Sequence, residues 1–196
     1  MAIYLIRHPE PAGVRGMCYG RRDFSCDAHT LASAASAARA QLPERALADS
    51  RVFTSPLSRC RALARALIGR RAVSVAHELI ELDFGAWEGI RWDALPRGEL
   101  DAWARDVWHY RPGGGESAAM VEERWRRWCD RIASLEARPI VAVTHAGVIR
   151  TALAASGVLA RPDAASANIA FGSVYAIEPP ARSLRARRAR EESAGA

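Results

Sequence analysis

Short apolar runs alternate along the chain with longer segments in which hydrophobic residues recur at helical spacing. Five runs of four to six residues are rich in apolar or β-branched side chains and are bounded by polar or turn-forming residues, which is the pattern of strands. They cover residues 2–7, 51–54, 73–76, 140–144 and 173–177. The run at 140–144 is apolar almost throughout, so we expect that strand to be buried on both faces.

Helical periodicity dominates the intervening segments. The clearest case is the apolar stripe of Val121, Trp125, Trp128, Ile132 and Leu135, which predicts a helix that Ser117 caps and that ends near residue 136. The other predicted helices begin at Asp27 or Thr30 and end at Leu42, or cover residues 58–68, 148–155 and, within an irregular stretch at 79–115, about 100–107.

The order of these elements predicts the fold class. Near-continuous apolar strands separated by helices indicate an α/β protein with three layers, in which helices cover both faces of a mainly parallel central sheet. No linker or internal repeat divides the chain, so we expect a single domain over residues 1–180. Ligands of such sheets bind beyond the carboxyl ends of the strands.

The charged residues of the chain argue against some classes of function. The chain has 196 residues and a net charge of +6, and all 28 of its basic residues are arginine. The absence of lysine from the sequence excludes enzymes that use a phosphate-loop lysine or a lysine Schiff base. Arginines crowd residues 181–196, which we expect to form a disordered tail. Because no aromatic residue is interleaved with them, we expect no nucleic-acid partner.

The same sequence favours a cytoplasmic protein. No apolar run is long enough to span a membrane, and the N-terminus lacks the pattern of a secretory signal. No two of the four cysteines form a C-x-x-C pair, so we expect reduced thiols and no metal site. We therefore expect no membrane partner and no cofactor.

Residues suited to phosphate chemistry follow three of the predicted strands. Arg7 and His8 end the first strand, Arg59 lies in the first turn of the helix after the second, and His145 follows the fourth. A parallel sheet brings these ends to one edge. An arginine beside the free N–H groups of a helix N-terminus makes a phosphate site. Each residue also has an interpretation without function. Arg7 could form a salt bridge, Arg59 could be exposed to solvent, and each histidine could be an ordinary hydrogen-bonded residue at the edge of the sheet.

A metal site is the competing interpretation of the two histidines. The sequence has no H-x-H or H-E-x-x-H spacing, and nearby arginines repel a cation, so we expect no metal. Phosphoryl chemistry also requires an acid, for which the irregular stretch offers Glu81, Asp83 and Glu88. Each of them is equally a candidate for an ordinary surface carboxylate.

The motifs together resemble a known family, the histidine phosphatase superfamily of phosphoglycerate-mutase-like proteins. The motifs are residues 5–8 (LIRH), residues 55–60 (SPLSRC), the Glu81 loop and residues 144–150 (THAGVIR). Within the family, residues 18–23 (CYGRRD), 81–89 (ELDFGAWEG) and 114–117 (GGES) are most similar to the α-ribazole-5′-phosphate phosphatases of cobalamin biosynthesis. The chain departs from the family at Pro9, where glycine is usual, and at Ala146 in the second histidine motif.

The resemblance implies roles for the residues above. It implies a metal-independent phosphomonoesterase in which His8 carries the phosphoryl group and Glu81 is the proton donor. Arg7, Arg59 and His145 are then the groups that neutralise the phosphate. Tyr19, Arg21 and Glu116 are candidates for contacts with the rest of a small phosphorylated metabolite, or for turn packing, a surface charge and a helix N-terminal carboxylate. Four tryptophans between Trp87 and Trp108 either stack on a flat base or pack a core or lid.

Other interpretations stay open at this point. Within the same family, they are a phosphatase of another phosphorylated metabolite, a phosphoglycerate mutase, or a protein phosphohistidine phosphatase. A different class of function is a catalytically silent or nucleic-acid-binding module. We expect a monomer or a homodimer, as is usual for phosphatases of this type.

Overall fold

The computed structural model describes residues 2–133, 135 and 138–180. Within these residues lies a five-stranded sheet with the strand order β3-β2-β4-β1-β5. Its strands are β1 (Ile3–Arg7), β2 (Arg51–Thr54), β3 (Val73–Val75), β4 (Ile140–Thr144) and β5 (Val174–Ile177). β1 to β4 run parallel, and β5 pairs antiparallel with β1 at one edge. The predicted α/β class with a mainly parallel sheet is confirmed.

Helices connect the strands. They are α1 (Ala28–Gln41), α2 (Glu44–Asp49), α3 (Ser58–Ile68), α4 (Arg97–Arg105), α5 (Ala118–Ile132), α6 (Ala146–Ala155) and α7 (Arg161–Ser166), with 3-10 turns at His77–Leu79, Gly85–Trp87, Trp92–Ala94 and Pro112–Gly114. The cap of α1 is Asp27, whose carboxylate accepts from the backbone N–H of Thr30 at 2.8 Å, as N-caps do. The sequence pattern did not predict α2 and α7, because six residues are too few to show a helical period.

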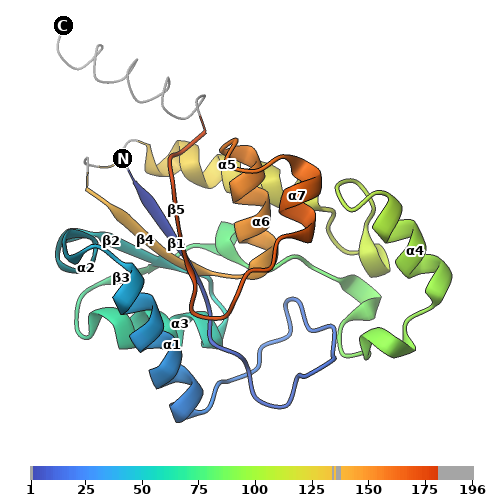
Figure 1. Cartoon of the computed structure of the whole chain (residues 1–196), viewed down its shortest axis with the longest axis horizontal. Helices are drawn as coiled ribbons and strands as arrows, with labels where there is room; N and C mark the ends of the chain where they lie inside the picture. Colours follow the sequence, from blue (N-terminus) through green and yellow to red (C-terminus); the bar gives the residue numbers. More distant parts are fainter. Residues whose placement is uncertain (1, 134, 136–137, 181–196) are drawn as a thin grey trace, which may run out of the picture.

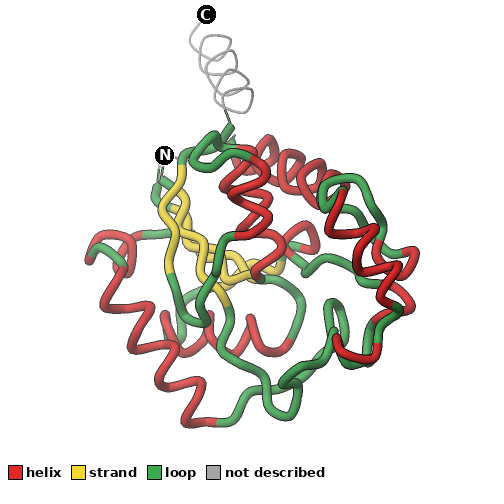
Figure 2. Tube along the Cα trace, turned by 45° about the vertical axis from the view of Figure 1, so that its right-hand side comes forward, coloured by secondary structure: helices red, strands yellow, loops and turns green. Residues whose placement is uncertain are grey.

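The two faces of the sheet are buried against different helices (Figures 1 and 2). Successive strand residues point to opposite faces. Leu5 packs with Trp125 and Ile149 in the cluster that contains α5 and α6. Ile6 packs with Ala35 and Leu63 in the cluster that contains α1 and α3. In Figure 1, α1 and α3 lie below the sheet and α5, α6 and α7 above it, which confirms the three predicted layers.

A smaller aromatic lobe extends from the sheet around α4 (Figure 1). Its buried residues are Cys18, Trp87 and Leu95, and Phe84, Trp92 and Trp103 are among the half-buried side chains that pack on them. An isolated bridge between Met17 and Arg91 ties the loop after β1 to this lobe. The irregular stretch at 79–115 is therefore an ordered structure with its own apolar centre.

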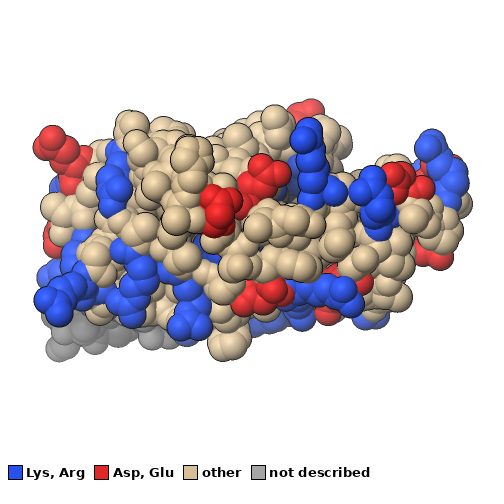
Figure 3. All heavy atoms as spheres, turned by 90° about the horizontal axis from the view of Figure 1, so that it is seen from below, with Lys and Arg blue, Asp and Glu red and all other residues tan. Residues whose placement is uncertain are grey.

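Charges of both signs cover the surface. On the face seen from below, arginine side chains are interspersed with acidic ones (Figure 3). Within the described ranges, no helix has the length and apolar composition that a membrane span requires. Residues 181–196, for which the sequence predicts a disordered tail, lie outside the described residues.

Candidate active site

The register of the sheet brings the ends of β1, β2 and β4 together. Arg7 pairs with Thr144, and Thr54 pairs with Val143. The ladder continues for one residue past each strand, because His8 N–H donates to Thr144 O at 3.0 Å and Ser55 N–H donates to Val143 O at 3.0 Å. His8, Ser55 and His145 therefore occupy one level at the carboxyl edge of the sheet, as the strand pattern predicts.

The imidazole of His8 has a defined tautomer. Its Nδ1 lies 2.7 Å from the carbonyl oxygen of Pro9. A carbonyl oxygen only accepts, so Nδ1 carries the proton and Nε2 keeps its lone pair. Pro9 lacks a backbone N–H, but the group that orients His8 is its carbonyl, which proline retains. The departure from the family at this position therefore preserves a nucleophilic nitrogen.

His145 lies against His8 at the same edge. The two rings meet edge to face with their centroids 4.9 Å apart. Nε2 of His145 lies 2.7 Å from Ser55 Oγ, and Nδ1 lies 3.4 Å from Nη2 of Arg59. Arginine only donates, so Nδ1 accepts and Nε2 donates to Ser55. Ser55 stands in a motif quoted above, but its role in orienting His145 was not predicted.

Two guanidinium groups complete the cluster. Arg59 is fully buried, and its Nη1 and Nη2 donate to the carbonyls of Arg22 and Gly20 at 2.8 and 2.7 Å. Its ion pair with the carboxylate of Asp23 is 3.8 Å long. Arg7 donates to the carbonyl of Ile169 and stacks on Phe171, 3.7 Å from the ring centroid.

These partners do not fully neutralise the positive charges of Arg7 and Arg59. The Nε atoms of Arg7 and Arg59 are buried and have no hydrogen-bond partner in the structure. Neutral carbonyls satisfy N–H groups but do not neutralise charge, and a buried cation is costly until an anion reaches it. Among the described residues no carboxylate forms a salt bridge with Arg7, and Arg59 is buried rather than exposed. The arrangement is suited to bind a tetrahedral anion.

Burial holds both imidazoles neutral. Loss of hydration is the main cause that lowers the pKa of His8 well below its ordinary value of 6.5, and Arg59 adds to it. The pKa of His145 is lowered in the same way, first by burial and then by His8 and Arg59. A neutral His8 is the form whose Nε2 is able to attack phosphorus.

We expect these lowered pKa values to make stability depend on pH. In the unfolded chain both histidines bind protons as the pH falls through about 6.5. In the folded chain they stay neutral to lower pH, because their pKa values are lowered. The free energy of unfolding should therefore decrease below pH 6.5, by up to about 3 kcal/mol per pH unit for the pair. Urea unfolding between pH 7.5 and 5.5 measures it. The His8→Ala variant should show a shallower decrease, and a wild-type stability that stays flat or rises on acidification contradicts the prediction.

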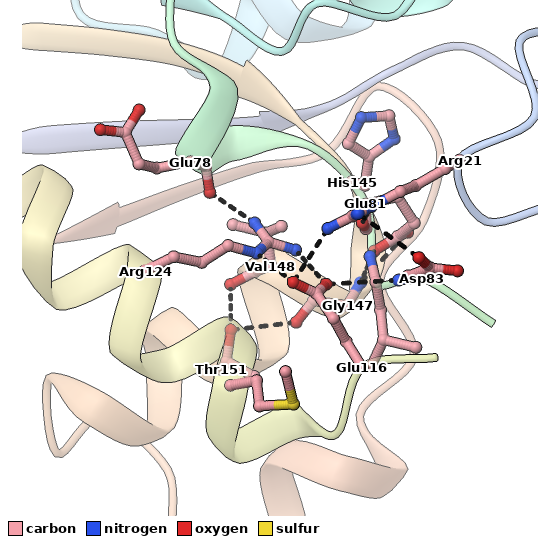
Figure 4. Close-up of polar contacts among 12 residues, drawn as sticks. Arg21, Glu78, Glu81, Asp83, Glu116, Arg124, His145, Gly147, Val148 and Thr151 are labelled. Atoms are coloured by element: carbon pink, nitrogen blue, oxygen red, sulfur yellow. Dashed lines mark hydrogen bonds and ion pairs between the residues drawn. The ribbon is translucent and has the colours of Figure 1, made fainter. Parts of the chain in front are cut away.

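The carboxylate of Glu81 accepts from Gly147 at the start of α6, two residues after His145 (Figure 4). Its Oε1 and Oε2 accept from Gly147 N–H at 3.2 and 3.4 Å, and Oε1 also accepts from Leu82 N–H at 2.9 Å. The first N–H groups of a helix attract a carboxylate, so they hold this side chain at the N-terminus of the helix that His145 precedes.

The other two candidate acids have different partners. Glu88 accepts from the backbone N–H groups of Arg21, Arg22 and Phe84 at 2.8 to 3.1 Å and so joins two loops. Asp83 accepts from Gly85 N–H at 2.7 Å and pairs with Arg21 at 3.4 Å. Glu81 is therefore the carboxylate whose position suits an acid.

The three candidate substrate contacts are placed differently. Tyr19 lies over Arg59, 5.1 Å from its ring centroid to the guanidinium carbon, and burial raises the pKa of its phenol. Arg21 and Glu116 bond to each other at 2.9 Å. Glu116 bonds in turn to Arg124 at 3.1 Å (Figure 4). That Tyr19, Arg21 and Glu116 touch substrate stays a prediction.

The ion pairs that Glu116 forms with Arg21 and Arg124 also help to hold the loop of Glu81 in place. Arg21 Nε donates to the backbone carbonyl of Glu81 at 3.3 Å, and Glu116 Oε2 accepts from Asp83 N–H at 3.3 Å. Arg124 is buried on α5, and burial lowers its pKa. Arg124 was not among the residues predicted from the sequence. Within the described ranges, no group of three or more histidine, cysteine, aspartate or glutamate residues is arranged to hold a metal; that the reaction needs no metal stays a prediction.

Known proteins resemble this chain in sequence and in fold. A sequence profile of the histidine phosphatase superfamily, branch 1, matches residues 3–191. The bifunctional protein Rv2228c of Mycobacterium tuberculosis is 37% identical over 138 residues, which are 64% of this chain and 37% of that protein. The chain thus matches little more than a third of the length of this curated relative.

Two solved structures are also similar. The α-ribazole phosphatase of Shigella flexneri has a TM-score of 0.77 and 25% identity, with 91% of this chain and 90% of that chain covered. The mycobacterial glucosyl-3-phosphoglycerate phosphatase Rv2419c, in complex with VO3, has a TM-score of 0.77 and 24% identity, with 90% and 92% covered. The similarity to Rv2419c shows that the two proteins share a fold.

Proposed function

Because the chain belongs to the histidine phosphatase superfamily, we propose that it hydrolyses phosphomonoesters through a phosphohistidine on His8. One observation carries the proposal. The imidazole of His8 has a free Nε2, and it lies in a cluster with two guanidinium groups whose buried Nε atoms have no partner in the structure. A phosphate group supplies the missing negative charge and presents its phosphorus to the nucleophile.

In the first step, Nε2 of His8 attacks phosphorus and the bond to the ester oxygen breaks. Arg7 and Arg59 stabilise the equatorial oxygens, which is the main contribution a protein makes to phosphoryl transfer. The bound anion favours the protonated form of His145, so this ring becomes a further donor. Protonated Glu81 gives its proton to the leaving oxygen, and the alcohol departs.

In the second step, water replaces the histidine. The carboxylate of Glu81, now deprotonated, takes a proton from water as the water oxygen attacks phosphorus. The bond between phosphorus and Nε2 breaks, which returns neutral His8 and inorganic phosphate. The groups that carry this cycle are side chains of the chain itself, so we propose that it needs no metal ion.

The substrate that the sequence favours is α-ribazole-5′-phosphate. Residues 18–23, 81–89 and 114–117 carry this similarity, and the Shigella flexneri α-ribazole phosphatase shares the fold over most of both chains. The structure adds that these three segments form one unit, since Glu88 bonds the first to the second and Glu116 bonds the third to both. The four cysteines are free, which suits a reducing compartment, and we propose the cytoplasm.

A substrate panel tests the proposal. We expect kcat/KM for α-ribazole-5′-phosphate to exceed that for glucosyl-3-phosphoglycerate, phosphoserine and 3-phosphoglycerate by about tenfold or more, a difference of about 1.4 kcal/mol in transition-state binding. A chelator should not change the rate. A higher kcat/KM for another ester reassigns the substrate. Conversion of 3-phosphoglycerate that depends on a bisphosphorylated primer indicates a mutase instead.

A further inference from the structure

An aromatic cavity opens beside the proposed acid. It has a volume of about 200 Å³, and Glu81 and Gly147 are among the residues that line it. Phe84, Trp92 and Trp103 of the aromatic lobe also line it and form its aromatic wall. Because Glu81 lines the cavity, the cavity begins at the group that protonates the leaving oxygen in the proposed reaction. We propose that this cavity binds the alcohol part of the substrate and selects phosphomonoesters whose alcohol carries a planar aromatic ring.

The wall is a rigid set of rings. Trp92 and Trp103 are parallel, with an interplanar angle of 10° and centroids 5.8 Å apart. Phe84 meets both of them edge to face, with centroid distances of 5.6 and 6.0 Å. All three side chains are half-buried, so part of each ring stays accessible. Rings held by one another offer a flat apolar surface at low entropic cost when a ligand stacks on it.

Two other lining residues, Trp108 and Arg150, have side chains that hydrogen bonds hold in place. Trp108 is buried, and its Nε1 donates to Glu122 at 3.1 Å, which fixes its ring. Arg150 also lines the cavity, with its Nε bonded to the carbonyl of Ala167 at 3.0 Å. The cavity therefore has an apolar aromatic half and a polar half formed by Glu81 and Arg150. A ring fits the first half, and hydroxyl or ring-nitrogen acceptors near the ester fit the second.

The size of the cavity limits what it holds. Pockets that enclose a whole drug-sized ligand measure about 300–1,000 Å³, so a smaller space takes one ring system rather than an entire molecule. A glycerate or serine alcohol leaves the aromatic wall exposed to water and gains nothing from it. A ring that covers the wall gains about 10- to 100-fold in binding, as base stacking on aromatic side chains does. The inference rests on the proposed phosphatase reaction and specifies its substrate class.

Two esters that differ at C1′ test it. α-Ribazole-5′-phosphate carries the benzimidazole ring there, ribose 5-phosphate carries a hydroxyl group, and both release a 5′-alcohol, so the ratio of their kcat/KM values reports what the ring adds. We expect Trp103→Ala to lower this ratio about tenfold or more. Arg97→Ala is the matched control, because Arg97 lies on the same helix and its side chain is 87% exposed. The inference is overturned if wild type hydrolyses both esters equally or if Trp103→Ala keeps the wild-type ratio.

A binding measurement separates this inference from the reaction. α-Ribazole without phosphate should quench tryptophan fluorescence of the wild-type protein, and ribose should not. Trp103→Leu, which keeps an apolar side chain, should weaken this binding about tenfold, with a melting temperature close to that of wild type as the check on folding. Quenching without hydrolysis of any ester rejects the proposed function and supports the cavity. Hydrolysis without any binding of α-ribazole rejects the cavity alone.

Discussion

Replacing His8 with alanine is expected to lower kcat at least about 10⁴-fold and to abolish the phosphoenzyme, because removal of a nucleophile leaves only binding and charge stabilisation. The structure gives the reason. Nδ1 of His8 is committed to the carbonyl of Pro9, so Nε2 is the atom available to phosphorus. The neighbouring His145 does not replace it, since its Nε2 is committed to Ser55 Oγ at 2.7 Å.

The measurement is trapping of the protein in alkaline detergent after mixing with a ³²P-labelled phosphomonoester. Wild type should retain label that is lost in acid and kept in base, whereas His8→Ala should retain none. His29→Ala is the control, because His29 is exposed on α1 and takes no part in the site. Binding of inorganic phosphate should persist in His8→Ala, since both arginines remain. Acid-labile label on His8→Ala at the wild-type level would show that another residue is the nucleophile.

The core of this site was predictable because each of its residues follows an apolar strand. The pattern at 2–7, 51–54 and 140–144 predicts strands, and a parallel sheet fixes which ends meet. His8 and His145 therefore meet although 137 positions separate them in the sequence. The helix at Ser58–Ile68 has the predicted bounds, which places Arg59 in its first turn.

The contacts around this core were not predictable in the same way. The residue pattern offered Glu81, Asp83 and Glu88 without distinguishing them, and it was the family resemblance that implied Glu81. The partner that a loop carboxylate finds depends on loops distant in sequence. Glu88 is committed to N–H groups near residue 21, and Glu81 to the start of α6. No periodic pattern contains that information.

Arg124 was not predicted as part of this network, although its position in the sequence does indicate a buried ion pair. It lies three residues after Val121 and one before Trp125, on the buried stripe of α5, where a charge is unusual. A charged residue on an apolar face needs a buried partner. The partner is Glu116, which ties α5 to the Glu81 loop through Arg21.

Replacing Glu81 with glutamine is expected to lower kcat for an alkyl phosphomonoester about 10²- to 10⁴-fold, the usual contribution of a general acid and base. The amide oxygen of glutamine is still able to accept from Gly147 N–H, so the loop should keep its position. The inhibition constant of inorganic phosphate should change little, because the arginines that bind the anion are intact. The expected loss is therefore in kcat rather than in binding.

The leaving group of the substrate determines which step of the reaction is slow in Glu81→Gln. An alkoxide needs the proton of Glu81 in order to leave, whereas 4-nitrophenolate leaves without one. With 4-nitrophenyl phosphate, Glu81→Gln should form the phosphoenzyme at nearly the wild-type rate and hydrolyse it slowly. A burst of one equivalent of nitrophenol followed by a slow steady state is the expected signature, and the labelled phosphoenzyme should accumulate.

Asp83→Asn is the matched comparison for this variant. Asp83 lies two residues from Glu81 in the same loop, and its carboxylate bonds to Gly85 N–H and Arg21 rather than to the start of α6. If Asp83→Asn shows the burst and Glu81→Gln turns over normally, the acid is Asp83. If Glu81→Gln alone shows the burst, the acid is Glu81. The hydrogen bond of Glu81 to Gly147 N–H, 3.2 Å long, then holds the acid of the reaction in the lining of the aromatic cavity.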